Sequence, residues 1–160
     1  MKLIKDGAIV DPGWSFPGHP DARGGDHKQV FPFEIYLAER EHISELGIPL
    51  GIQIDVDTDL DDVAPFIDQL ALIVINFATY ADGRGFSIAH RMRHSLGYAG
   101  IIWGRGSLIA DQYALAIQCG IDAVLVEDQL LDRQPIEHWQ EALRNAPAPY
   151  RYHPDMAQGH

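Results

Sequence analysis

Apolar residues in this chain recur in two alternating patterns, which are short continuous runs and stretches with helical spacing. The four runs are at residues 50–54, 72–76, 100–104 and 123–126, and the stretches that follow them are at 60–70, 87–96, 108–119 and 135–145. Alternation of buried strands with amphipathic helices is typical of βαβ units. The pattern therefore predicts an α/β fold with a mostly parallel sheet of four to five strands.

The amino-terminal part of the chain follows a different pattern. The turn dipeptide Asp6-Gly7 separates two short apolar segments, which predicts a β-hairpin over residues 2–10. A stretch rich in proline and glycine comes next, without apolar periodicity. We expect a long loop there, ordered where Trp14 and Phe16 pack against the body of the protein.

Length and pattern together predict a single domain, because 160 residues suffice for one hydrophobic core. We expect this domain over residues 1–150, with 1–32 as the hairpin and long loop, and a flexible tail over 151–160. Two arrangements remain open. One is an open sheet with helices on both faces, and the other is half of a (β/α) barrel that a second copy of the chain completes as a homodimer.

The charge balance limits the classes of partner. Twelve lysines and arginines stand against 23 acidic residues, a formal net charge of −11. This field repels phosphate, so we expect no nucleic-acid partner and no anionic membrane surface. No apolar run reaches the roughly 18 residues of a membrane span, and the expected location is the cytoplasm. An anion site would have to be a local basic spot, whereas the acidic surface favours a basic protein partner.

Charged residues follow each of the four predicted strands. Because the carboxyl ends of parallel strands share one edge of the sheet, we expect these residues to face one crevice. The acidic ones are Asp55, Asp57 and Glu127, and the basic ones are Arg84 and Arg105.

The segment Asp82-Gly83-Arg84-Gly85 precedes a helix that we expect to begin near Ser87. Helix N-terminal N–H groups favour an anion, and glycines permit close approach of the backbone. The pattern thus suggests a small oxyanion held by Gly83, Gly85, Ser87 and a bidentate Arg84, with Arg105 nearby. The alternative is purely structural: the glycines supply positive φ angles and Ser87 caps the helix.

The loop after the third apolar run carries a second set of polar candidates, which are Ser107, Asp111 and Gln112. Ser107 is suited to cap a helix, and the other two are polar positions in an otherwise apolar stretch. A capping and loop-bonding role is favoured over catalysis. Cys119, the single cysteine, is expected to be a buried apolar group because it has no fixed base partner in the pattern.

No metal or cofactor motif is recognisable in the sequence. The acidic run over residues 55–63 departs from a calcium loop, because Leu60 stands where glycine is needed. A helix cap at Thr58 or Asp59 explains the run more simply. The spacing of Gly83 and Gly85 matches neither a P-loop nor a dinucleotide fingerprint, and no flavin, haem or cluster motif occurs.

Several of these residues resemble the pattern of a bacterial family, the domain of unknown function 934, associated with sulfite reduction as an oxidoreductase. The resemblance is carried by Asp82–Ser87, Ala89, Arg93, Gly97-Tyr98, Gly106, Asp111-Gln112 and Cys119-Gly120. It implies a partner, the sulfite/nitrite reductase subunit beside which family members are encoded. This chain departs from the family at His90, at residues 101–104 and at Ser107, where the family usually has charged residues.

Three functions follow from these observations. The first is an accessory protein of assimilatory sulfite reduction that binds a small oxyanion at the segment from Asp82 to Ser87. The second is a non-enzymatic acidic partner or scaffold of a sulfite reductase complex. The third is an independent enzyme in which Asp55 and Glu127 work with a divalent metal.

Overall fold

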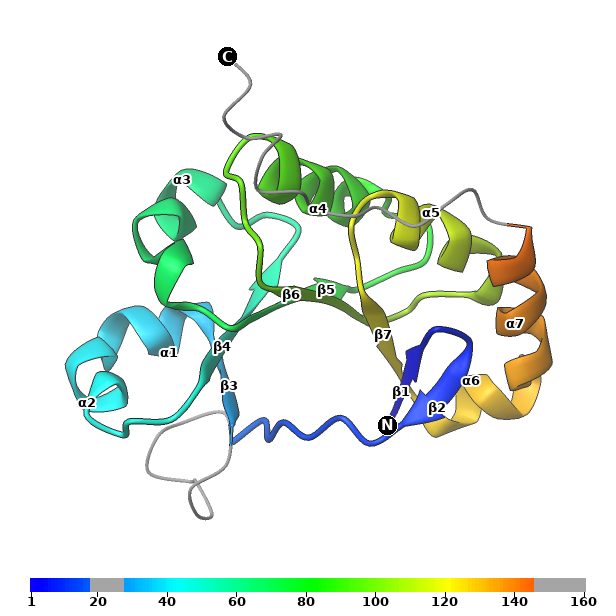
Figure 1. The fold of residues 1–160 in the computed structure, drawn as a ribbon, viewed down its shortest axis with the longest axis horizontal. Helices are drawn as coiled ribbons and strands as arrows, with labels where there is room; N and C mark the ends of the chain where they lie inside the picture. Colours follow the sequence, from blue (N-terminus) through cyan, green and yellow to red (C-terminus); the bar gives the residue numbers. More distant parts are fainter. Residues whose placement is uncertain (18–27, 146–160) are drawn as a thin grey trace.

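A computed structural model describes residues 1–17 and 28–145, which form a seven-stranded sheet with a layer of helices (Figure 1). The strand order is β2-β1-β7-β6-β5-β4-β3. The strands are β1 (Lys2–Lys5), β2 (Ala8–Val10), β3 (Gln29–Pro32), β4 (Leu50–Asp55), β5 (Leu72–Phe77), β6 (Ile101–Gly106) and β7 (Ala123–Val126). β1 pairs antiparallel with β2 and β7, and the block from β3 to β7 is parallel throughout.

The described helices all pack against one hydrophobic cluster, on the face of the sheet that we call the helix face (Figure 1). They are α1 (Phe33–Ala38), α2 (Arg40–Ser44), α3 (Leu60–Val63), α4 (Arg84–His94), α5 (Tyr113–Gln118), α6 (Asp128–Arg133) and α7 (Ile136–Arg144), with the 3-10 helices η2 (Ala64–Gln69) and η3 (Ala110–Gln112). Since β3 to β7 are neighbours in sequence order and run in one direction, their carboxyl ends share one edge.

The central strand β5 explains how the two faces arise. Its sequence is LIVINF, with β-branched residues that favour a strand, and side chains alternate between the faces. Ile73 and Ile75 belong to the cluster on the helix face, whereas Leu72 and Val74 belong to a second cluster on the opposite face. All four are fully buried.

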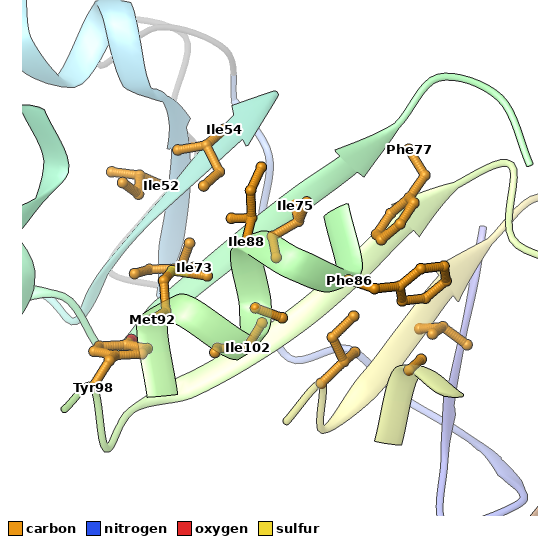
Figure 2. Packing of buried hydrophobic residues seen from close by; sticks show 14 of the residues in the cluster. Ile52, Ile54, Ile73, Ile75, Phe77, Phe86, Ile88, Met92, Tyr98 and Ile102 are labelled. Carbon is orange, nitrogen blue, oxygen red and sulfur yellow. The ribbon is translucent and has the colours of Figure 1, made fainter. Parts of the chain in front are cut away.

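Helix α4 forms the centre of the helix face (Figure 2). Ile88, Ala89 and Met92 lie on one side of this helix at helical spacing, and all three are buried in the cluster with the strand residues. A Cβ atom on Gly85 would lie 2.4 Å from the ring of Phe77. Glycine at this position therefore allows the first turn of α4 to pack directly on β5.

In the part of the chain that the structure describes, the opposite face is covered by a thin segment instead of helices. Its cluster consists of strand residues, with Trp14 and Phe16 packed against it. These two belong to residues 11–17, which we call the strap, and which leads from β2 across this strap face to β3 (Figure 1). The strap is anchored at its far end, where Ser15 accepts a 2.8 Å hydrogen bond from the N–H of Val30. Trp14 and Phe16 thus pack against the body of the protein, which is the condition under which we expected this segment to be ordered.

The predicted α/β class and mostly parallel sheet are confirmed, but four to five strands is too few. The hairpin adds β1 and β2 to the same sheet, and β3 lies in the region expected to be loop. The apolar pattern does not predict β3, because this strand has only two consecutive apolar residues between Gln29 and Pro32. The loop and tail residues 18–27 and 146–160 lie outside the described part of the chain.

The predicted open sheet with helices on both faces is wrong for the part of the chain that the structure describes. Sequential parallel strands with helices on one side are the features of a half barrel. The described sheet is open, with β2 and β3 at its edges. Completion of a barrel by a second copy stays a prediction.

Candidate functional site at the carboxyl edge of the sheet

The loops that carry the charged candidates share one edge, as predicted from their places after successive strands. β4, β5, β6 and β7 are neighbours and parallel, so the segments that leave them emerge on the same side. The edge is not one crevice, however. A cavity of about 570 Å³ includes Arg84, Asp55 and Asp57 in its lining, whereas Arg105 and Glu127 lie outside that lining.

Arg84 is held by two carboxylates of the chain. Its Nε and Nη2 atoms donate to Asp82 at 3.0 Å and 2.7 Å, and Nη1 donates to Oδ1 of Asp57 at 2.6 Å. These hydrogen bonds, first that to Asp82 and then that to Asp57, raise the pKa of Arg84. The same side-chain bond lowers the pKa of Asp82. An incoming oxyanion would therefore have to compete with both carboxylates for this guanidinium.

The start of α4 also differs from the sequence prediction. The helix begins at Arg84, three residues before Ser87, with Gly83 as its N-cap. Oδ1 of Asp82 accepts a 3.2 Å hydrogen bond from the backbone N–H of Arg84, so a carboxylate of the chain itself occupies the helix N-terminus. Gly83 has a φ of −80°, and Gly85 is a packing glycine inside the helix. The alternative explanation by positive φ angles and a Ser87 cap is therefore wrong too.

Arg105 lies near the carboxyl end of β6 in a different environment. Its Nη1 donates to Oε1 of Gln53 at 2.7 Å, and its guanidinium carbon lies 4.6 Å from the centre of the Phe16 ring. The residue is half-buried. Among the described residues it forms no ion pair, in contrast to Arg84. Its charge is thus oriented by a neutral amide and an aromatic face, and no carboxylate of the described residues balances it.

Arg93 is a structural residue at the other end of α4. Five of its contacts are hydrogen bonds of 3.1 Å or less: two to the carbonyl of Gly120, one each to the carbonyls of Tyr98 and Gly100, and one to Oδ2 of Asp122. The side chain is buried. It joins α4 to the entrances of β6 and β7 and is not available for a ligand.

Gln112 connects two loops of the edge. Its Oε1 accepts from the N–H of Ile109 at 3.2 Å, and its Nε2 donates to the carbonyl of Tyr80 at 2.7 Å. The predicted loop-bonding role is confirmed for this residue. Ser107 is exposed and is not a helix cap, because η3 begins at Ala110 with Ile109 before it. Asp111 is exposed.

Cys119 packs as an apolar group, as predicted, but it is less buried than expected. It packs against the cluster on the helix face and is partly buried. Burial raises the pKa of its thiol, which keeps it in the unreactive protonated form.

The acidic residues have local structural roles or stand apart. Oδ1 of Asp59 accepts from the N–H of Asp61 at 2.9 Å and caps α3, as predicted. Within the described ranges no three potential ligands come together to hold a metal ion. Asp55 and Glu127 leave β4 and β7, so three strand spacings of about 4.8 Å, or about 14 Å, separate their backbones. This separation does not favour a shared metal ion.

Comparison with known families gives one match. Residues 51–159 fit the model of a family described as "Bacterial protein of unknown function (DUF934)". The chain belongs to this family. No curated protein matches the chain. Among the residues that the structure covers, no helix is long and apolar enough to cross a membrane.

Several residues through which the chain resembles this DUF934 family have clear structural roles. Gly97 has a φ of +65° and ends α4, where the N–H of Tyr98 bonds to the carbonyl of Met92 at 2.9 Å. Gly106 and Gly120 also have positive φ angles, and a Cβ on either would lie 2.5 Å from a neighbouring atom. In this family member, the resemblance therefore reflects packing as much as chemistry. Asp82 and Arg84 stand out because they are held at the edge without being part of the core.

Proposed function

We propose that this protein is an accessory protein of sulfite reduction that binds a small oxyanion at the carboxyl edge of the sheet, with Arg105 as the principal ligand. The observation that supports it is the environment of Arg105. A half-buried guanidinium is oriented by Gln53 and faced by Phe16, and none of the described ion pairs includes it. Guanidinium groups in this state bind carboxylates, sulfite-like anions and phosphates in a bidentate manner.

The segment from Asp82 to Ser87 has the weaker claim. Its helix N-terminus and its arginine are both engaged by Asp82, and Asp57 adds a second negative charge. The net charge of this trio is negative, which opposes the approach of an anion. We therefore assign the segment a secondary role, as a separate and weaker candidate at the same edge of the sheet.

The link to sulfite comes from the resemblance to the family. Its members usually have an arginine at the position of Trp103. Trp103 and Arg105 are two residues apart on β6, so their side chains emerge on the same face of the sheet. Arg105 thus presents a guanidinium on the strap face one pleat, about 7 Å, further along the strand. This placement is consistent with an anion-binding arginine at position 105 in this member, in place of the family's usual arginine at position 103.

A thermal-shift series with sulfite, sulfate and phosphate tests the proposal, with chloride at equal ionic strength as reference. An oxyanion at about 100 times its Kd is expected to stabilise the fold by about 2.7 kcal/mol, or roughly 5–10 °C in Tm. Arg105→Gln should abolish the shift, and the control Arg84→Gln should retain most of it. No oxyanion-dependent shift in the wild type, or a shift that survives Arg105→Gln, would contradict the proposal.

A second function is supported by the acidic lining of the 570 Å³ cavity. Six carboxylates line it against the single cation Arg84: Glu34, Asp55, Asp57, Asp59, Asp62 and Asp82. Such a surface attracts a basic protein, and the family association names a reductase subunit as the candidate. Binding should weaken steeply with salt and fall in Asp57→Asn/Asp62→Asn. Absence of binding to purified reductase at low salt would remove this function.

A further inference from the structure

A cavity of about 600 Å³ lies under the strap, at the end of the sheet opposite to the proposed oxyanion site. Its lining includes Lys28 before β3, Ile101 at the start of β6 and Asp122 before β7. These positions place it at the amino ends of the parallel strands. Its volume is within the range of small-molecule sites, about 300–1,000 Å³.

Two tryptophans line this cavity from different elements. Trp14 belongs to the strap and is half-buried, while Trp103 belongs to β6 and is 4% exposed. Both belong to or pack against the cluster on the strap face. Indole rings offer large, rigid surfaces for a planar ring at little cost in side-chain entropy.

The charged groups of the lining favour an anion. Asp122 is already paired with Arg93 at 2.8 Å, so this pair is internally balanced. Lys5 and Lys28 then stand against the single carboxylate of Asp11. The ammonium of Lys28 lies 5.7 Å from the centre of the Trp14 ring, a cation–π contact worth only about 0.5–1 kcal/mol at an exposed site. Lys28 is therefore placed to exchange this contact for a ligand's negative charge beside the same ring.

We propose that the cavity under the strap binds a planar aromatic anion, a ring that carries a carboxylate or sulfonate. The ring stacks against Trp14 with Trp103 at its side, and the anionic group pairs with Lys28 and Lys5. In a chain with a net charge of −11, this is a local basic spot of the kind that an anion site requires. The proposal is independent of the oxyanion site at Arg105.

Two-dimensional ¹H–¹⁵N spectra of the full chain test this with 2-naphthoate as the probe. The three tryptophan side chains give three indole N–H signals. Trp14 and Trp103 should shift on titration, whereas Trp139 should not, because it is fully buried on the helix face and its indole N–H bonds to Gln134 at 3.0 Å. Neutral 2-naphthamide and non-aromatic cyclohexanecarboxylate should each bind at least about tenfold more weakly.

Matched variants complete the experiment. Lys28→Gln should raise the Kd for 2-naphthoate about tenfold, and Lys2→Gln, an exposed lysine outside the lining, should leave it unchanged. Arg105→Gln should also leave it unchanged, which separates this site from the oxyanion site. The proposal is overturned if naphthoate shifts neither Trp14 nor Trp103, if Trp139 shifts equally, or if Lys28→Gln binds as the wild type does.

Discussion

The two faces of the sheet are built from the same strands but covered in different ways. The helix face packs against every described helix, with apolar residues from strand and helix interdigitating (Figure 2). The strap face has a smaller cluster, covered among the described residues by Trp14 and Phe16. The 600 Å³ cavity proposed for an aromatic anion and the Arg105 side chain both involve this thinly covered face. The difference suggests that the helix face supplies stability and the strap face supplies binding.

The largest expected effect compares two adjacent buried residues of β5. Ile73 faces the helices and Leu72 faces the strap, and both are fully buried. Ile73→Ala should lower the free energy of unfolding by about 4 kcal/mol, because the helix layer cannot collapse into the cavity. Leu72→Ala should cost about 2 kcal/mol, since a strap can settle more easily. Urea denaturation measures the free energy of unfolding of both variants. Equal losses would contradict the proposed difference between the two faces.

The next comparison uses two arginines. Arg93→Lys removes a guanidinium that satisfies three carbonyls and Asp122, and it should lower the free energy of unfolding by about 3 kcal/mol. Arg105→Lys removes one hydrogen bond, to Gln53 on the strap face. It should change the free energy of unfolding by less than about 1 kcal/mol. The measurement is again chemical denaturation. A large loss for Arg105→Lys would assign that residue to the scaffold and weaken its role as a ligand.

Two glycines at the start of α4 give a smaller effect. A Cβ on Gly85 would lie 2.4 Å from Phe77, so Gly85→Ala should cost about 1–2 kcal/mol despite a gain of about 1 kcal/mol in helix propensity. Gly83→Ala is the control, because its nearest contact would be Phe86 at 3.9 Å, and it should cost less than about 1 kcal/mol. Thermal unfolding of both variants measures the difference. Equal Tm values would show that α4 can shift away from β5.

The smallest effect concerns the pKa of Asp82, which Arg84 lowers. A carboxylate with a lowered folded pKa stabilises the fold above its unfolded pKa of about 3.9, and this contribution disappears as the pH falls through the folded value. An NMR titration of the side-chain carboxyl should therefore give a midpoint below about 3.9. In Arg84→Gln the midpoint should return toward that value. An unchanged midpoint would mean that the ion pair does not persist in solution.

Much of the fold follows from the sequence because its signals are local. Continuous apolar runs such as LIVIN predict strands buried on both faces, and that prediction holds for β5. The sequence does not reveal what covers each face. Leu72 and Val74 are as apolar as Ile73 and Ile75, although the first pair faces a strap and the second faces helices.

The candidate site is less accessible to sequence reasoning because its decisive contacts are long-range. Arg84 pairs with Asp57, which is 27 positions earlier, and Arg105 bonds to Gln53, which is 52 positions earlier. Neither partner has a spacing that a local motif would display. The early start of α4 was hidden for a local reason: Asp82 accepts from the first N–H of the helix, that of Arg84, although its position in the sequence is typical of a glycine turn.

The length of the strap has a geometric consequence for the whole sheet. Five residues lead from Val10 in β2 to Ser15 beside β3, and consecutive Cα atoms are about 3.8 Å apart, so this path spans at most about 19 Å. The route through the sheet crosses six strand spacings of about 4.8 Å, about 29 Å in total. In a flat sheet the edge strands β2 and β3 would be too far apart for this segment to connect them. The number of residues between Val10 and Ser15 thus sets a lower limit on the curvature of the sheet, which is visible in Figure 1. A longer strap would allow the sheet to become flatter.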